Sequence, residues 1–420
     1  MPRASVLQYD WLKEKMRLNP SITGVPGFFR QFLLLVCAAL FLTACATGGS
    51  QSGGFNSADN QLTPGQPRPT IKVAFLLPLS GPGSSASLAK ALKQAGELAL
   101  FELDNPAVTL LTKDTLGTPK GAQAAASAAI QAGAELVIGP LFAKSVTAAA
   151  SVTRQANVPM IAFSSDQSVA GNGVYLLSFL AGRDVPNIVS YAMSQGRRNF
   201  AALIPKTAYG RIVEGAFRNA VSAQGGQLVA IEQFKPDANS VLAPAKRLAA
   251  YALSEDPAVP PRIDALFIPS GQAMLPTVSA LMPYFEIDTS RIKLLGTGLW
   301  DYPNIGREKP LIGGWFPAPD PKGWRAFTQR YVKTYETTPP RLASLAYDAV
   351  AIAITLSSGK PGRRYTQNLL TRQRGFAGVD GLFRLLNDGT SERGLAILEV
   401  QKFGARVIQP APLTFGRAQF

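Results

Sequence analysis

The chain has 420 residues, of which 46% are hydrophobic and 16% charged, so it can bury sizeable cores and its composition argues against intrinsic disorder. It contains no histidine, which excludes Ser-His-Asp and Cys-His catalysis and removes the most common metal ligand. The formal net charge of +15 favours anionic partners, but no arginine-rich run follows residue 50, so we expect no nucleic-acid partner.

The N-terminal segment has the layout of an export signal. Arg30 precedes an apolar run over residues 32–42, which is about half as long as a membrane-spanning helix but suits the core of a signal peptide. The sequence LTAC that ends at Cys45 resembles the lipobox of bacterial lipoproteins. This resemblance implies a signal peptide over residues 1–44, lipidation of Cys45 and a periplasmic, lipid-anchored protein. Because Ala46 rather than aspartate follows the cysteine, the resemblance also implies sorting to the outer membrane.

Residues 45–69 are rich in glycine, serine and proline and show no apolar periodicity, so we expect a flexible tether between the lipid and the folded part. The two cysteines, Cys37 and Cys45, both precede the folded part, which excludes a disulfide framework or a thiolate metal cluster downstream. Residues 1–15 do not resemble the start of a signal peptide, and Met16 is an alternative start.

From residue 70 onward, short apolar runs alternate with alanine-rich segments of helical length. This part of the sequence predicts strands over residues 71–77, 108–112, 135–138, 160–163 and 174–178, and helices over residues 86–103, 120–132 and 144–157. Strict alternation of strand and helix indicates a parallel, doubly wound α/β sheet. We expect this first lobe to span residues 70–184.

The same alternation restarts near Arg197. It predicts strands over residues 200–204, 227–232, 265–268 and 293–295, and helices over residues 211–224, 240–254 and 272–283. We therefore expect a second lobe of the same α/β type over residues 185–317.

Residues 341–356 place apolar side chains at helical spacing and predict an amphipathic helix. Within this helix we interpret Tyr347 as a packing residue and Asp348 as a surface charge.

The C-terminal section predicts a β-hairpin. Residues 381–386 and 395–400 are apolar runs on either side of the turn Asn387-Asp388-Gly389. We expect residues 318–372 to complete the first lobe and residues 373–420 to complete the second.

Several stretches between residue 70 and the C-terminus match one known family. They are IKVAFLLPLSG at residues 71–81, ELVIGPL at 135–141, NVPMIAFSS at 157–165, AYG at 208–210, LAYDAV at 345–350 and GLFRLLNDGTSERGLAILEV at 381–400. In order and spacing the chain resembles the type I periplasmic binding proteins, the leucine-binding-protein-like family. This resemblance implies two α/β lobes joined by crossing segments, with a ligand cleft between them.

Ligand contacts in such a cleft come from loops beyond the carboxyl ends of the strands. The residues that we predict to bind the ligand are Ser80, Gly81, Ser84, Ser85, Ser164, Ser165, Tyr209 and Asp301. Hydroxyl and N–H groups at a helix start suit a carboxylate, Tyr209 can cover the ligand, and Asp301 can pair with an ammonium group. The alternatives stay open that Ser84 and Ser85 only cap a helix and that Tyr209 only packs.

The function that these residues favour is capture of a small polar, amino-acid-like ligand for uptake, without catalysis and without a cofactor. One stretch departs from the amino-acid binders, because no hydroxyl residue follows Gly139-Pro140 until Ser145. The pattern of Gly139, Pro140, Leu141 and Val146 resembles instead the outer-membrane lipoproteins that activate penicillin-binding proteins. That resemblance implies a class A penicillin-binding protein as the alternative partner, and activation of peptidoglycan synthesis as the alternative function.

Residues 81–86 also satisfy the dinucleotide-binding pattern G-x-G-x-x-[GA] between a predicted strand and a predicted helix. Asp114 ends the next strand, where a ribose-binding acid would sit. The lack of histidine and the export signal argue against a dinucleotide enzyme, so we interpret this loop as a wall of the ligand cleft.

Overall fold

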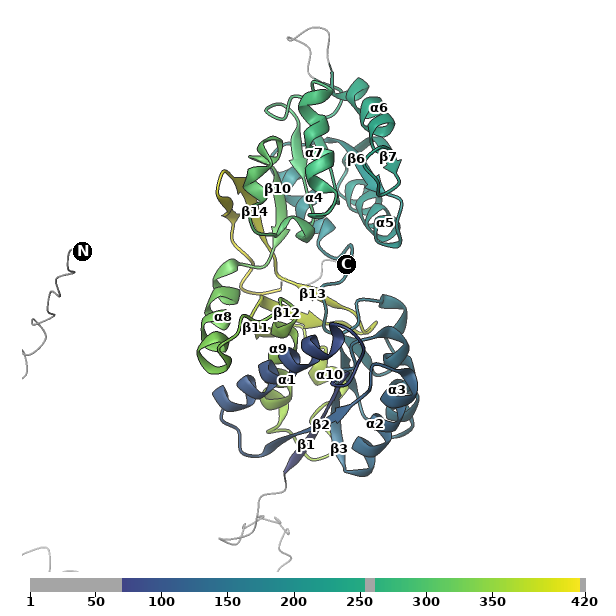
Figure 1. Cartoon of the computed structure of the whole chain (residues 1–420), viewed down its shortest axis with the longest axis vertical. Coiled ribbons are helices and arrows are strands. Elements are labelled where there is room, and N and C mark those ends of the chain that lie inside the picture. Colours follow the sequence, from purple (N-terminus) through teal and green to yellow (C-terminus); the bar gives the residue numbers. More distant parts are fainter. Residues whose placement is uncertain (1–69, 254–260, 416–420) are drawn as a thin grey trace, which may run out of the picture. The chain divides into compact units, whose positions relative to one another are not determined.

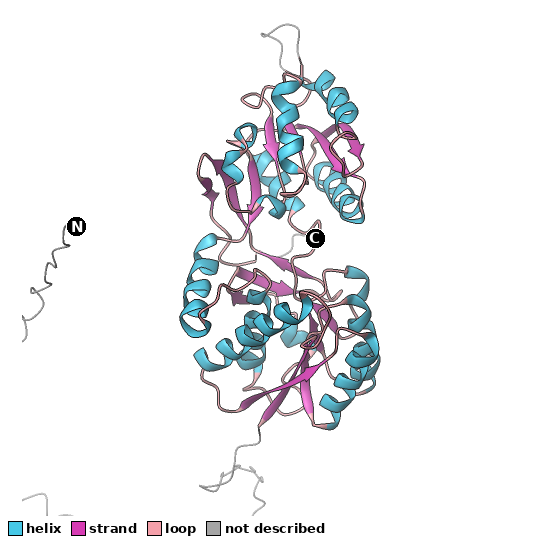
Figure 2. Cartoon of the chain, viewed as in Figure 1, coloured by secondary structure: helices cyan, strands magenta, loops and turns pink. Residues whose placement is uncertain are grey.

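The computed structural model describes residues 70–253 and 261–415. In this part of the chain the strands form two mostly parallel sheets and one small antiparallel sheet, and Figures 1 and 2 show the helices packed around them. The predicted signal peptide, the lipidation site Cys45 and the tether lie outside the described residues. No helix of the described part is both long and apolar enough to cross a membrane.

The first sheet consists, in the described part, of five parallel strands in the order β2-β1-β3-β4-β5. Its elements are β1 (Ile71–Leu77), α1 (Ser85–Glu102), β2 (Val108–Asp114), α2 (Pro119–Gln131), β3 (Ala134–Ile138), α3 (Ala143–Gln155), β4 (Met160–Ala162) and β5 (Val174–Leu176), with the short 3₁₀ helix η1 (Gln167–Val169). The predicted strand–helix alternation and the parallel α/β class are confirmed here.

Strand β1 is buried because helices cover both faces of the first sheet. Val73 and Phe75 pack in one core with α1 and α9 (Ala343–Leu356), whereas Ala74 and Leu76 pack in another with α2 and α3. A strand that is covered on both sides carries a continuous apolar run rather than an alternating one. The sequence IKVAFLL has this pattern, which explains why its bounds could be predicted.

The second sheet has, among the described residues, seven strands in the order β15-β14-β10-β9-β8-β6-β7. Strands β6 to β10 run parallel, and β14 and β15 add antiparallel pairings at one end. Helices α6 and α7 pack on one face, and α4 and α5 on the other. The elements are α4 (Val185–Ser194), β6 (Asn199–Pro205), α5 (Ala208–Ala223), β7 (Gln227–Phe234), α6 (Leu242–Ala252), β8 (Ala265–Phe267), α7 (Leu275–Tyr284), β9 (Lys293–Leu295), η2 (Gly298–Trp300), η3 (Ile305–Arg307), η4 (Lys309–Leu311), β10 (Trp315–Ala318), β14 (Ala396–Gln401) and β15 (Gly404–Gln409).

Later parts of the chain return to the first sheet. They are α8 (Pro321–Tyr335), α9, α10 (Gln367–Leu370) and the antiparallel strands β11 (Phe376–Gly378), β12 (Gly381–Leu385) and β13 (Ser391–Arg393). Phe327 of α8, Val350 of α9 and Phe383 of β12 all belong to the core that contains Phe75. Residues 376–393 therefore pack with the first lobe, and only β14 and β15 join the second sheet.

One expectation for these later parts needs correction. The predicted hairpin is wrong, because β12 pairs with β13, whereas β14 pairs with β10 and β15 in the second sheet. The turn at residues 387–389 closes the shorter β12–β13 hairpin. The sequence patterns also do not predict α4, β10 or α8, which the structure contains.

Within the described residues up to the end of β15, three segments carry the chain between the first lobe and the second, and we call them the crossing segments. Residues 177–184 connect β5 to α4, residues 319–320 connect β10 to α8, and residues 394–395 connect β13 to β14. After β15 the chain returns once more, and the ring of Phe415 lies 4.5 Å from the guanidinium carbon of Arg384 on β12.

Candidate functional site

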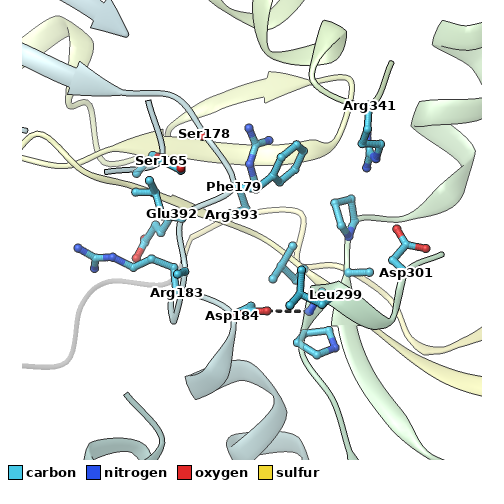
Figure 3. A pocket seen from close by; sticks show the side chains of 18 of the residues that line it. Ser165, Ser178, Phe179, Arg183, Asp184, Leu299, Asp301, Arg341, Glu392 and Arg393 are labelled. Carbon is cyan, nitrogen blue, oxygen red and sulfur yellow. Dashed lines mark hydrogen bonds between the residues drawn. The ribbon is translucent and has the colours of Figure 1, made fainter. Parts of the chain in front are cut away.

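A cavity of about 530 Å³ lies where the crossing segments meet, and Figure 3 shows the side chains that surround it. Its wall combines elements of both lobes, since Ser165 follows a strand of the first sheet and Tyr209 and Asp301 follow strands of the second. Apolar parts of the wall include Phe179, Leu180, Ile212, Leu299, Pro317 and Pro319. Charged parts are Arg183, Asp184, Asp301, Arg341, Glu392 and Arg393. The volume and this mixed lining are typical of a small-molecule site.

Three predicted site residues line this cavity, namely Ser165, Tyr209 and Asp301. The structure does not bring the other five to it, and these are Ser80, Gly81, Ser84, Ser85 and Ser164. The hydroxyl of Ser164 is buried and accepts the N–H of Asp166 at 3.1 Å. Any ligand contact by these five residues stays a prediction.

The glycine-rich loop before α1 makes hydrogen bonds within the first lobe. The backbone N–H of Ser80 donates to the carboxylate of Asp114 at 3.1 Å, and the N–H of Leu116 donates to the same carboxylate at 2.8 Å. Partial burial opposes the effect, but hydrogen bonds from Ser80 and Leu116 hold the pKa of Asp114 below its ordinary value. Asp114 thus holds the strand-to-helix turn before α1 together, so its carboxylate is already used within the lobe.

The serines of this loop also have local roles. The hydroxyl of Ser85 donates to the carbonyl of Pro82. Ser84 is the N-cap residue of α1, yet its side chain makes no capping hydrogen bond within the described residues. A side-chain cap by Ser84, one of the open alternatives, is therefore absent.

Tyr209 stands in the first turn of α5. Thr207 caps this helix by accepting the N–H of Gly210 at 3.0 Å, and a Cβ at position 210 would lie 1.8 Å from a backbone carbonyl of β6. Glycine at position 210 is therefore needed for the tight turn that presents Tyr209. The phenol shares a hydrogen bond of 2.9 Å with the hydroxyl of Thr297. Burial and the charge of Asp184 raise the pKa of Tyr209, although the hydrogen bond with Thr297 opposes them, so the phenol is neutral at physiological pH.

Asp301 follows η2 and is exposed to the cavity. Within the described residues its carboxylate makes no hydrogen bond and no ion pair. Burial by the walls of the cavity raises the pKa of Asp301. The positive charge of Arg341 opposes this rise, whereas the negative charge of Asp380 raises the pKa further. A carboxylate that is enclosed but unpaired can accept hydrogen bonds from a cationic or neutral donor of a ligand.

Asp184 links the first crossing segment to η2. Its carboxylate accepts the N–H of Gly298 at 2.8 Å, which is the dashed line in Figure 3. Burial raises the pKa of Asp184, and the hydrogen bond from Gly298 opposes that rise. Because Gly298 begins η2, this contact fixes the start of the helix that carries Asp301 against the crossing segment.

The two arginines Arg341 and Arg393 of the wall belong to a charge cluster that the sequence did not predict. Its charged members are Arg341, Asp348, Asp380 and Arg393. Arg341 forms an ion pair with Asp380, which also accepts the hydroxyl of Ser344 at 2.7 Å. The interpretation of Asp348 as a surface charge is wrong, because its side chain is only 1% exposed and accepts the N–H of Val379 at 2.7 Å. We call these four side chains the buried charge cluster.

Burial raises the pKa of Asp348 to about 7, Arg393 opposes this effect and Asp380 adds to it. All three guanidinium nitrogens of Arg393 are buried and have no hydrogen-bond partner within the described residues. In the same residues, no group of three or more carboxylates and cysteines is arranged to hold a metal ion.

Residues 70–405 match the family model described as periplasmic binding protein. The chain belongs to the periplasmic binding protein family. The predicted family and the predicted two-lobed α/β fold are thereby confirmed. Among curated proteins no match is found.

Solved structures of similar fold include a candidate branched-chain amino acid ABC transporter protein from Rhodospirillum rubrum, with a TM-score of 0.68, 19% identity and coverage of 81% of this chain and 100% of that one. An ABC transporter substrate-binding protein from Desulfitobacterium hafniense in complex with leucine has a TM-score of 0.58, 18% identity and coverage of 81% and 100%. A solute-binding protein from Rhodopseudomonas palustris in complex with 3,4-dihydroxybenzoic acid has a TM-score of 0.56, 18% identity and coverage of 83% and 99%. At these identities the similarity shows that the periplasmic binding protein fold is shared.

Proposed function

We propose that this periplasmic binding protein is a non-catalytic solute-binding protein that holds a small, amino-acid-like ligand in the cavity between its crossing segments. The observation that carries the proposal is the composition of this cavity, in which side chains of both lobes face the same space. A ligand in that space contacts both lobes, so its binding favours the arrangement in which both sets of contacts form.

The chemistry of the wall suits an amphipathic ligand. Asp301 offers an unpaired carboxylate to an ammonium group, Tyr209 offers a ring edge, and Phe179 and Leu299 offer apolar surface. Two relatives of similar fold are in complex with leucine and with 3,4-dihydroxybenzoic acid. Both molecules combine a carboxylate with an apolar body, which supports a ligand of this general kind here.

Calorimetric titration of the full chain with the protein amino acids and a set of benzoates tests the proposal. We expect at least one of them to bind, and we expect Asp301→Asn to weaken the binding of an amino acid about 10-fold, because a charge-assisted hydrogen bond is lost. Glu286→Gln is the matched control, since Glu286 is exposed and lies outside the cavity wall. Failure of every compound in the panel to bind the wild-type chain would overturn the proposed function.

We further propose that Cys45 is lipidated and anchors the protein in the periplasm, at the outer membrane. The support is the LTAC sequence, the preceding apolar run and the absence of an aspartate at position 46. Several acyl chains give stable anchoring where a single chain does not. We expect Cys45→Ser to move the protein from the membrane fraction to the soluble periplasmic fraction. An unchanged distribution after membrane fractionation contradicts this assignment.

The alternative is an activator of a class A penicillin-binding protein. It is supported by the sequence around Gly139, by the positive net charge and by Phe142, whose side chain is 39% exposed directly after Leu141. Pull-down against purified class A penicillin-binding proteins separates the two proposals. Capture of such a synthase by a chain that binds no small ligand favours the alternative, and no capture eliminates it.

A further inference from the structure

One cationic side chain of the cavity wall is placed to receive an anion. The guanidinium carbon of Arg341 lies 4.5 Å from the ring centroid of Trp324 and 5.3 Å from that of Phe179. The Arg341 side chain remains 33% exposed, and Figure 3 shows it beside the cavity. Aromatic faces hold a guanidinium by cation–π attraction and leave the N–H groups at its edge available.

The donor capacity of Arg341 is mostly unused. A guanidinium has five N–H donors in a fixed fork that matches a carboxylate. Within the described residues its ion-pair partner is Asp380, its charge also acts on Asp301 and Asp348, and its guanidinium donates no hydrogen bond. A ligand anion can therefore approach the remaining edge without displacing a protein partner.

The other two arginines of the described wall differ from Arg341, because Arg183 is paired and the guanidinium nitrogens of Arg393 are buried. Arg183 donates to Thr390 at 2.6 Å and pairs with Asp388 at 3.3 Å. Arg393 has its guanidinium nitrogens buried in the interior of the first lobe, 5.4 Å from the ring of Phe383 as measured from the guanidinium carbon. Arg183 is also partly exposed, but in the described part it lies over no aromatic ring, so Arg341 is the exposed arginine of the wall that two rings hold in place.

The buried charge cluster increases the positive charge at Arg341. Two arginines and two aspartates form the buried charge cluster, so it is neutral when both aspartates are ionised. Burial raises the pKa of Asp348 to about 7, so a substantial fraction of molecules carry it protonated near neutral pH. The cluster then has one positive charge in excess, and Arg341 is its member on the cavity surface.

The serines that the sequence predicts to bind a carboxylate are not alternatives to Arg341 as the anion-binding group of this cavity. Ser80, Ser84 and Ser85 do not line the cavity, and Ser85 already donates to Pro82. Asp301 and Asp184 also present carboxyl groups to the cavity, and Asp301 lies near enough to Arg341 for its charge to oppose the rise in the pKa of Asp301. A ligand whose anionic end lies at Arg341 therefore has its neutral or cationic part near the two aspartates, and a second anionic group there would be repelled.

We propose that Arg341 is the anion subsite of the cavity and that the ligand is an amphipathic monocarboxylate whose carboxylate pairs with this guanidinium between Trp324 and Phe179. This inference rests on the proposed function and names the group that recognises the ligand. The apolar body of the ligand lies against Phe179, Leu299 and Pro319, and an amino group, where present, faces Asp301.

The test compares carboxylates with their amides in calorimetric titrations of the full chain. The probes are leucine with leucinamide and benzoate with benzamide, because each amide keeps the shape of its acid and loses the negative charge. We expect the wild-type chain to bind the preferred carboxylate at least about 10-fold more tightly than its amide, as for a hydrogen-bonded charge.

The variant Arg341→Gln/Asp380→Asn removes the cation together with its buried partner, so the carboxylate of Asp380 is not left without Arg341. We expect it to weaken carboxylate binding about 10- to 100-fold and to bind acid and amide with similar affinity. The matched control is Arg330→Gln/Glu102→Gln, which removes an arginine that also pairs with a carboxylate and lies over a tyrosine ring, outside the cavity. This control is expected to keep wild-type affinity.

The outcomes separate the inference from the function on which it rests. Binding of no carboxylate by the wild-type chain overturns the proposed function and the inference with it. Equal binding of acid and amide, or wild-type affinity in the double variant, overturns the inference alone. If thermal melting shows that the double variant does not fold, the variant Arg341→Lys tests the inference instead. It keeps the positive charge beside Asp380 but loses the planar guanidinium that can donate two hydrogen bonds to a carboxylate. We expect a loss of about 5-fold or more for that variant, and unchanged affinity overturns the inference.

Discussion

The substitution Asp348→Asn tests the electrostatics behind the cavity through the stability of the fold. Asp348 is 1% exposed and packs against Gly378, where a Cβ would lie 2.5 Å from its carboxylate. Burial raises the pKa of its carboxyl from 3.8 to about 7, Arg393 opposes the rise and Asp380 adds to it. Asparagine keeps the size and the oxygen that accepts the N–H of Val379, but it cannot ionise.

The sign follows from proton linkage. Between pH 3.8 and about 7 the folded chain keeps the proton on Asp348 while the unfolded chain has lost it. The stabilisation by this group is complete below pH 3.8 and is lost as the pH rises through about 7. The gap between the two pKa values corresponds to about 4 kcal/mol of unfolding free energy.

The measurement is urea unfolding of the wild-type chain and of Asp348→Asn by circular dichroism, from pH 4 to pH 8. A constant offset from the altered hydrogen bonding cancels in the pH dependence. We expect the variant to gain about 4 kcal/mol relative to the wild type across this interval. Asp237→Asn is the control, because the Ser240 hydroxyl and N–H lower the pKa of this exposed carboxyl from 3.8, so its linkage falls below the measured pH range and no comparable gain is expected. A difference between wild type and Asp348→Asn that stays within about 1 kcal/mol at every pH refutes the reasoning.

Three further substitutions probe the fold and the cavity. Gly139→Ala is expected to destabilise the chain by more than about 2 kcal/mol, because φ is 88° and the new Cβ would lie 2.1 Å from a carbonyl of β1; a melting temperature within a degree of wild type contradicts this. Thr118→Ala removes the hydrogen-bonded N-cap of α2 and is expected to cost about 1 kcal/mol, whereas Thr366→Ala, where no side-chain cap bond exists, serves as its control. Tyr209→Phe removes the hydrogen bond with Thr297 and is expected to cost about 1 kcal/mol in chemical unfolding; no measurable change means that this contact adds nothing to stability.

The sequence predicts the parallel strands well because their burial on both faces leaves a visible apolar run, as in β1. It fails for β10, where Pro317 interrupts the sequence WFPA. Proline lacks an N–H and normally marks an edge or a bulge, yet β10 lies between β9 and β14. It also fails for α4, whose sequence VPNIVSYAMS is rich in β-branched and polar residues of modest helix propensity. Packing against the second sheet decides the conformation of both segments.

The candidate site likewise contains residues that the sequence predicts and residues that it does not. Ser165, Tyr209 and Asp301 were predictable because they follow strands at the sheet edge where ligands bind in such folds. Arg341 and Asp348 were not, because their partners come from the turn before β12 and from β13, far away in sequence. Helical periodicity placed Asp348 opposite the apolar face of α9, but β11 and its turn cover that side. Only the tertiary structure shows that this side is interior.

The return of the chain to the first lobe after β15 determines which lobe carries an anchor or a fusion partner. Ile71 begins the first sheet, and Phe415 comes back to Arg384 of the same lobe. The second lobe is therefore inserted between segments of the first, and neither described end of the chain leaves from it. A membrane anchor before residue 70 or a reporter fused after residue 415 is carried by the first lobe alone. A movement of the second lobe relative to the first would then pull on neither attachment.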